Sequence, residues 1–316
     1  MEPRKRRVWT RAIAWVPVVG GMLLVTPEAV RACACGCSIF DVGGGSMLPS
    51  GPGRTAFLEY DYMDQSRNWN GSSSASSAKN DDKDLETHFT VAGLQYMFNR
   101  QWGAQAEVPY TFRSFKGTDD ATGLVTSHDW SQLGDIRIRG LYTGFLEDMS
   151  LGVTLGLKLP TGSFKEDRDL VDRDTQIGTG SLDALLGGFY RTHPWNGNWD
   201  WFVQAQADLP TVIQDHYRPG IEFDAATGID YTGFTLARVQ ISPVAQVLYS
   251  NRASDSGPNA DSDNTGYQRI MLSPGIEFEL HPFRLYFDVE IPVFQDFTGN
   301  QLAAPVLVKA VASWMF

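Results

Sequence analysis

The last stretch of the chain, "PVLVKAVASWMF" (residues 305–316), decides the fold. Every second residue is apolar, and Lys309 and Ser313 occupy two of the positions between them. Successive side chains of a β-strand point to opposite faces, so the alternation predicts a strand with one wholly apolar face. That face comprises Val306, Val308, Ala310, Ala312, Trp314 and Phe316.

The same period of two recurs throughout the chain before this stretch. It is clear in "RTAFLEYDYM" (residues 54–63), "DWFVQAQADL" (residues 200–209) and "RLYFDVEIPV" (residues 284–293). Such alternation predicts an all-β protein. Twelve segments begin near Arg54, Leu85, Trp102, Gln132, Ser150, Ile177, Trp199, Gly220, Leu236, Tyr267, Phe283 and Pro305.

The connections between these segments alternate in length. Short links lie around residues 99–101, 146–149, 193–198, 232–235 and 281–282, and long polar links lie around residues 64–84, 115–131, 162–176 and 251–266. Short turns at one end and long loops at the other are typical of outer-membrane barrels. We therefore expect a transmembrane, antiparallel, up-and-down β-barrel of about twelve strands over residues 54–316. The alternative is a secreted sandwich or jelly roll.

The first 32 residues have the features of a cleaved secretory signal peptide. A basic head is followed by the apolar run 12–25, and Val30 and Ala32 precede a cleavage point before Cys33. Residues 1–32 carry a net charge of +4, so their removal changes the net charge from −11 to −15. Such an acidic chain is not expected to bind nucleic acid, because phosphate contacts need clustered Lys and Arg. A signal peptide and a barrel together predict the bacterial outer membrane as the location.

Residues 33–53 form a Cys- and Gly-rich segment before the first strand, which we expect to be a lumenal plug or a periplasmic tail. Cys33, Cys35 and Cys37 are the three cysteines of the chain. Three thiolates at alternate positions suit a soft ion such as Cu(I) or Zn(II), although a fourth ligand is missing. A lipid on Cys33 and a bond to a partner are alternatives. A disulfide between Cys35 and Cys37 would be strained.

Three motifs resemble a known family. They are "LGDIRIRGLY" (residues 133–142), "GLKLPTGSF" (residues 156–164) and "IGTGSLDALLGGFY" (residues 177–190). They are similar to the outer-membrane barrels named for the MetA pathway of phenol degradation. The resemblance implies an outer-membrane barrel that passes small, apolar or aromatic solutes, and it carries over no catalytic residue. The cysteine segment is not part of the pattern.

The alternation also predicts which charged residues face the barrel interior. Two readings remain open, because these charges can stand on opposed walls of a narrow water-filled passage or pair across strands and fill the lumen. The candidates are Arg137, Arg139, Lys158, Asp200, Asp208, Glu222, Asp224, Asp230, Arg269, Arg284, Asp288 and Glu290.

These observations predict a porin-like passive channel for small solutes. The alternative is a non-conducting barrel that displays the cysteine segment for metal binding or partner docking. We expect no enzyme, because Asp215 and His216 would point to opposite strand faces and no serine has a hydrolase-like context. Expected partners are outer-membrane lipid, lipopolysaccharide near the acidic loops, a small solute, and the barrel assembly machinery through the strand that ends at Phe316.

Overall fold

The computed structural model describes residues 48–49, 51–119, 122–166, 171–194 and 197–316, and it is almost entirely β-structure. Two short 3-10 turns are the exceptions, η2 (Ser77–Lys79) and η3 (Arg173–Thr175). The strands are β1 (Gly53–Gln65), β2 (Arg67–Gly71), β3 (Ser73–Ser74), β4 (Asp82–Met97), β5 (Trp102–Thr118), β6 (Val125–Leu133), β7 (Ile136–Tyr142), β8 (Leu151–Leu159), β9 (Leu182–Thr192), β10 (Trp199–Val212), β11 (Glu222–Tyr231), β12 (Phe234–Leu236), β13 (Val239–Arg252), β14 (Tyr267–Leu280), β15 (Phe283–Ala303) and β16 (Leu307–Met315).

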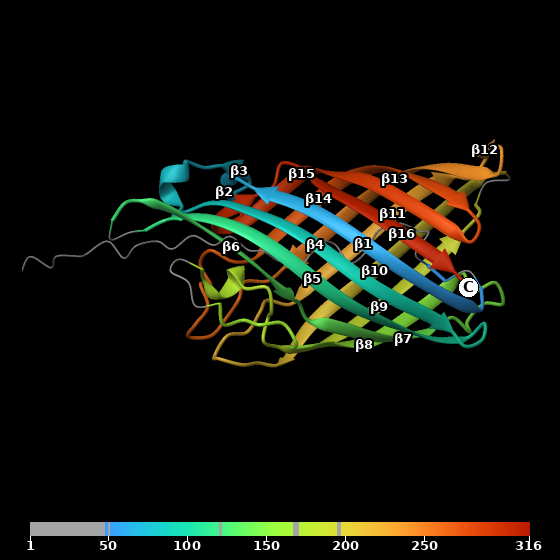
Figure 1. The fold of residues 1–316 in the computed structure, drawn as a ribbon, viewed down its shortest axis with the longest axis horizontal. Coiled ribbons are helices and arrows are strands. Elements are labelled where there is room, and N and C mark those ends of the chain that lie inside the picture. The colour runs from blue at the N-terminus through green and yellow to red at the C-terminus, as the bar shows by residue number, and fades with distance from the viewer. Residues whose placement is uncertain (1–47, 50, 120–121, 167–170, 195–196) are drawn as a thin grey trace, which may run out of the picture.

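Twelve antiparallel strands close into a barrel (Figure 1). The barrel strands pair in chain order, with β1 beside β4 and β11 beside β13, because β2, β3 and β12 lie outside this order. β1 closes the ring by pairing with β16 from Thr55↔Met315 to Met63↔Leu307. β6 and β7 both pair with β5 and act as one barrel strand, interrupted at Gly134 and Asp135. The predicted all-β barrel of about twelve strands is confirmed.

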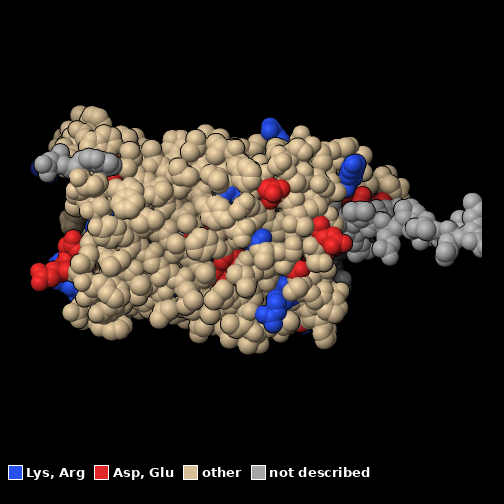
Figure 2. Space-filling view, turned by 180° about the vertical axis from the view of Figure 1, so that it is seen from behind, with Lys and Arg blue, Asp and Glu red and all other residues tan. Residues whose placement is uncertain are grey.

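The distribution of polar and apolar side chains is the reverse of that in a soluble protein. On β8 the outward Leu155 is 63% exposed, whereas the inward charged residues Asp183 on β9 and Lys309 on β16 are buried. A polar inner face and an apolar outer face are what a barrel in lipid requires. Figure 2 shows the resulting outer surface, a broad belt with few charged side chains. Within the described residues, no helix is long and apolar enough to cross a membrane.

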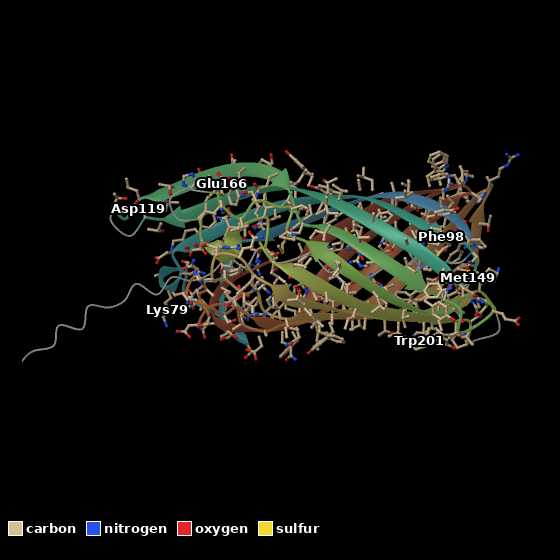
Figure 3. The ribbon with its side chains drawn as sticks, turned by 90° about the horizontal axis from the view of Figure 1, so that it is seen from below. Lys79, Phe98, Asp119, Met149, Glu166 and Trp201 are labelled. Atoms are coloured by element: carbon tan, nitrogen blue, oxygen red, sulfur yellow. The ribbon has the colours of Figure 1, made fainter. Side chains whose placement is uncertain are left out.

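The two ends of the barrel differ. Phe98 and Met149 lie at the end with short turns, whereas Lys79, Asp119 and Glu166 lie at the end with long loops (Figure 3). Aromatic pairs gather at the short-turn end, including Trp102–Tyr142, Trp199–Tyr231 and Trp314–Phe316, with ring centroids 4.6 to 4.9 Å apart. Aromatic girdles mark the membrane interfaces of such barrels. Short turns face the periplasm in such barrels, so the short-turn end is the periplasmic end.

Two strand pairs extend further outward than the alternation predicts. The predicted long link 115–131 is wrong, because β5 and β6 stay paired as far as Thr118↔Val125 and leave only residues 119–124 as a connection. Likewise β2 pairs with residues at the end of β15 from Gly71↔Phe297 to Arg67↔Ala303. The outward face of the β5–β6 extension carries polar side chains, among them Lys116, Ser127 and Asp129, so the lipid-facing alternation does not reveal it.

Candidate functional site: the polar lumen and its inner loop

The connection between β8 and β9 folds into the barrel. We call its described residues, 160–166 and 171–181, the inner loop. Arg113 points inward from β5, and its guanidinium donates to the backbone oxygens of Thr175, in η3, and of Gln176 at 3.0 Å. Arg113 and Thr175 are each 1% exposed. The inner loop therefore lies against the inner wall and narrows the lumen.

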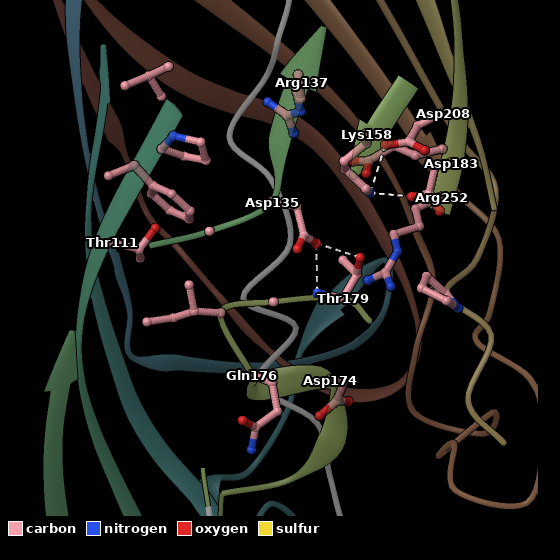
Figure 4. Close-up of a pocket in the computed structure, with 18 of the residues that line it drawn as sticks. Thr111, Asp135, Arg137, Lys158, Asp174, Gln176, Thr179, Asp183, Asp208 and Arg252 are labelled. Carbon is pink, nitrogen blue, oxygen red and sulfur yellow. Dashed lines mark hydrogen bonds and ion pairs between the residues drawn. The ribbon is translucent and has the colours of Figure 1, made fainter. Parts of the chain in front are cut away.

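Asp135, in the interruption between β6 and β7, is the main anchor of the inner loop. Its Oδ1 accepts a hydrogen bond from the backbone N–H of Gly162 at 2.9 Å. Its Oδ2 accepts from the backbone N–H of Thr179 at 2.8 Å and from the Thr179 hydroxyl at 2.6 Å (Figure 4). Hydrogen bonds to a carboxylate are roughly twice as strong as neutral ones. One carboxylate thus joins both ends of the inner loop to the wall.

The backbone near this anchor approaches itself too closely for larger residues. The Gly178 N–H donates to the backbone oxygen of Ser163 at 2.9 Å. A side chain on Gly178 would collide with the backbone of Gly162. Thr161 continues the contact, because its hydroxyl donates to the Gly134 oxygen at 2.9 Å and accepts from the Ile136 N–H at 2.9 Å. These contacts explain why small residues occur in the two motifs.

Arg173 joins the inner loop to the β10–β11 connection, which in turn contacts the β13–β14 connection. Its guanidinium lies 4.4 Å from the ring centre of Phe164 and 4.3 Å from that of Tyr217, and it donates to the Thr179 oxygen at 2.6 Å. The Tyr217 hydroxyl donates to Asp255. Burial raises the pKa of Tyr217 well above its usual value, so the hydroxyl keeps its proton and remains a donor.

The predicted lumenal residues all lie on inward strand faces. Arg137 and Arg139 are on β7, Lys158 on β8, Asp200 and Asp208 on β10, Glu222, Asp224 and Asp230 on β11, Arg269 on β14, and Arg284, Asp288 and Glu290 on β15. The structure therefore places these residues on six of the twelve barrel strands, and none of them on the arc formed by β16, β1, β4 and β5.

Many of these charges pair with near neighbours rather than facing each other across the lumen. Lys158 lies 2.8 Å from a carboxylate oxygen of Asp208 and also pairs with Asp183. Arg139 lies 2.6 Å from Glu107. Buried charges need such partners, because leaving water is costly for an isolated ion. Of the two readings, pairing along the wall is the one that the structure shows at these positions.

Other members of the predicted set are held by hydrogen bonds. Asp288 accepts from Tyr286 at 2.7 Å and from Gln246 and Ser273 at 2.8 Å. Asp200 contacts His193 towards the short-turn end. Further contacts are Glu222 with the Tyr267 hydroxyl at 2.8 Å, Arg284 with Glu279 at 2.9 Å and Glu277 at 3.3 Å, and Lys309 with Glu59 at 3.2 Å and Asp61 at 3.5 Å.

Several residues that build this site do not belong to the set predicted from the sequence. The predicted lumenal set omits Glu107, Arg113, Asp135 and Asp183. The period of two on β5 and β9 could have placed Glu107, Arg113 and Asp183 on the inward face. Asp135 and Asp183 also stand inside the family motifs. Nothing local indicated that Asp135 would hold a loop.

A chamber lies between the inner loop and the wall (Figure 4). Phe89, Val91, Pro109 and Ile177 supply apolar surface. Lys158, Asp183, Asp208 and Arg252 lie together on the side opposite Thr111. The chamber therefore has an apolar patch, which Glu59, Asp61 and Arg113 border, and a charged cluster opposite it.

Comparison with known proteins identifies the family. A family model described as "Putative MetA-pathway of phenol degradation" matches residues 65–303. The chain belongs to this family. The resemblance expected from the three motifs is thereby confirmed for the MetA-pathway family. Among curated proteins, none matches the chain significantly.

Solved structures support the fold of this MetA-pathway family member. An outer membrane channel from Pseudomonas putida F1 has 15% sequence identity and a TM-score of 0.65, over 87% of this chain and 100% of that one. The β domain of the Bordetella autotransporter BrkA has 12% identity and a TM-score of 0.51, over 84% and 100%. The closed barrel and these neighbours place the chain in the bacterial outer membrane, as predicted.

The signal peptide and the cysteine segment up to residue 47 lie outside the described residues, including Cys33, Cys35 and Cys37. No group of three or more His, Cys, Asp or Glu residues suited to a metal ion occurs in the part of the chain that the structure describes. Leu48, which follows the segment, packs against the inward apolar cluster that includes Phe57 and Met63.

Proposed function

We propose that this chain is a passive channel for small solutes, with its narrowest part at the chamber beside the inner loop. The observation that carries the proposal is a closed barrel that is lined largely by polar and charged side chains, in which the described part of the inner loop leaves a chamber beside the wall. A polar interior narrowed by a loop suits the passage of ions and small molecules.

The size of the chamber supports small solutes. It measures about 120 Å³. An apolar protein cavity of about 150 Å³ holds one benzene molecule. The four apolar residues on one side, Phe89, Val91, Pro109 and Ile177, would contact a solute with one ring. We therefore propose small, partly apolar or aromatic molecules as the solute class.

Single-channel recording tests this proposal. The chain without residues 1–32 would be refolded and inserted into a planar bilayer under reducing conditions. We expect steady conductance steps, because the charged inner wall keeps ions hydrated. A correctly folded barrel, verified by circular dichroism and resistance to unfolding in detergent, that gives no conductance would contradict the proposal.

The cysteine segment remains a second proposal. Leu48 lies among inward-facing side chains, which supports a segment that starts inside the barrel and acts as a plug. Cu(I) or Zn(II) bound by Cys33, Cys35 and Cys37 would then sit at or near the lumen. Cu(I) should reduce the conductance of the natural chain and leave that of a variant with all three cysteines changed to Ser unaltered. An equal effect of Cu(I) on the natural chain and on the variant would show that the cysteines do not bind the ion that reduces the conductance.

The expected partners follow from the outer face. The exposed apolar belt contacts membrane lipid. We propose that the strand ending at Phe316 is recognised by the barrel assembly machinery and that lipopolysaccharide meets the acidic outer loops. Removal of Phe316 should slow insertion into the outer membrane in cells while refolding into synthetic bilayers proceeds normally.

A further inference from the structure

We infer that the chamber selects ring-bearing solutes that carry a positive charge or a hydrogen-bond donor, and discriminates against carboxylates. This inference rests on the proposed channel function and adds a solute class to it. Three observations carry it: an apolar wall, unused acceptor oxygens on the facing wall, and the balance of charge around the chamber.

The apolar wall is made by separate elements that meet at one place. Phe89 and Val91 come from β4, Pro109 from β5 and Ile177 from the inner loop, and all four line the chamber. Ile177 also packs against the cluster of Leu85, Phe115, Trp130 and Leu302. The wall is therefore supported from behind. A ring lying against it would leave water, at a gain of roughly 25 cal/mol per Å² of apolar surface.

The charged wall contains carboxylate oxygens that accept no hydrogen bond within the described residues. Lys158 pairs with both Asp183 and Asp208, so one cation serves two carboxylates. Within the described residues, Oδ1 of Asp183 and Oδ1 of Asp208 have no hydrogen-bond partner. Both side chains line the chamber. Both Oδ1 atoms are buried, and the Asp208 side chain, 12% exposed, is the one that a donor on a solute would meet. A solute carboxylate would add a third negative group to the pair.

The net charge of the side chains that line the chamber is negative, like that of Asp183 and Asp208. Carboxylates outnumber basic side chains, and an acidic lining favours cations, as acidic rings do in cation channels. The carboxylates are Glu59, Asp61, Asp135, Asp174, Asp183, Asp208 and Glu222, and the basic side chains are Arg113, Arg137, Lys158, Arg173 and Arg252.

Three small probes distinguish the contribution of an aromatic ring to block from the contributions of charge and of its sign. Benzylammonium has a ring and a positive charge, methylammonium has the charge alone, and benzoate has the ring with a negative charge. Each would be added to the natural chain conducting in a planar bilayer, and the interruption of current would be measured against concentration. We expect benzylammonium to block at a concentration at least about tenfold lower than either other probe, which corresponds to 1.4 kcal/mol.

Two variants locate the site. Asp208→Asn should weaken block by benzylammonium about tenfold, since it removes one charge-assisted contact. Phe89→Ala should weaken the same block and leave methylammonium unaffected. Glu147→Gln, a carboxylate exposed in a short-turn connection, is the matched control and should change nothing.

The outcomes separate the inference from the channel proposal. If the natural chain does not conduct, the channel function fails. If it conducts and benzoate blocks as well as benzylammonium, the inference alone is overturned, whether or not the variants fold. Equal block by methylammonium and benzylammonium would likewise overturn the role of the apolar wall.

Discussion

At the residue scale, the lumen is defined by charges that share partners. The Lys158 side chain is 10% exposed, that of Asp208 is 12% exposed, and that of Asp183 is fully buried. Removing one member of a buried ion pair is costly, because the remaining charge keeps its desolvation penalty without the attraction that offset it. Lys158 therefore stabilises two carboxylates at once.

Changing Lys158→Met should lower the free energy of unfolding by about 3 kcal/mol, because two buried carboxylates lose their cation. Urea unfolding of the barrel from lipid vesicles, followed by tryptophan fluorescence, measures the change. The triple variant Lys158→Met, Asp183→Asn and Asp208→Asn should recover most of the loss.

Lys116→Met provides the matched control for this prediction. Lys116 lies 2.7 Å from Asp84, but its side chain is 51% exposed. Exposed pairs contribute at most about 1 kcal/mol, so this change should be small. Equal losses for Lys158→Met and Lys116→Met would show that burial of the cluster has no energetic consequence.

At the element scale, regular strands and the inner loop differ in what determines them. Strands follow from a local period of two, so all twelve barrel strands are predictable from sequence. The inner loop depends on bonds between Asp135 and residues 27 and 44 positions away, Gly162 and Thr179. No local pattern encodes such a contact, and the sequence alone predicts only a long polar loop there. The three family motifs include Asp135, Gly162 and Thr179, but they do not show that these residues contact one another.

Changing Asp135→Ala should release the inner loop, since three hydrogen bonds to a carboxylate are lost at once, each contributing about 1.5–3 kcal/mol. Single-channel records should then show a larger and noisier conductance. Asp135→Asn retains an acceptor oxygen, so its conductance should lie between that of the natural chain and that of Asp135→Ala. A conductance for Asp135→Ala that matches the natural chain would show that the inner loop does not narrow the passage.

At the scale of the whole molecule, the described residues place both charged groups and a buried apolar cluster inside the barrel. Exposed apolar side chains lie on the outer face, charged side chains and an apolar cluster that includes Phe57, Phe202 and Leu248 lie inside, and the inner loop fills part of the space they enclose. From the sequence, the inward charges could either face each other across a passage or pair across strands. In the structure they pair mainly along the wall. The chamber at the inner loop is therefore the place where a solute meets both apolar and charged surface.

The most direct test places a single thiol in the chamber. Cys33, Cys35 and Cys37 would be changed to Ser, and Ile177→Cys would be introduced alongside Glu147→Cys as a separate control. Reaction with a thiol reagent carrying a trimethylammonium group should sharply reduce the conductance of the Ile177→Cys channel, because the added bulk and charge lie in the passage. The Glu147→Cys channel should be unaffected. An unchanged conductance after complete labelling of Ile177→Cys, verified by mass spectrometry, would contradict a passage through the chamber.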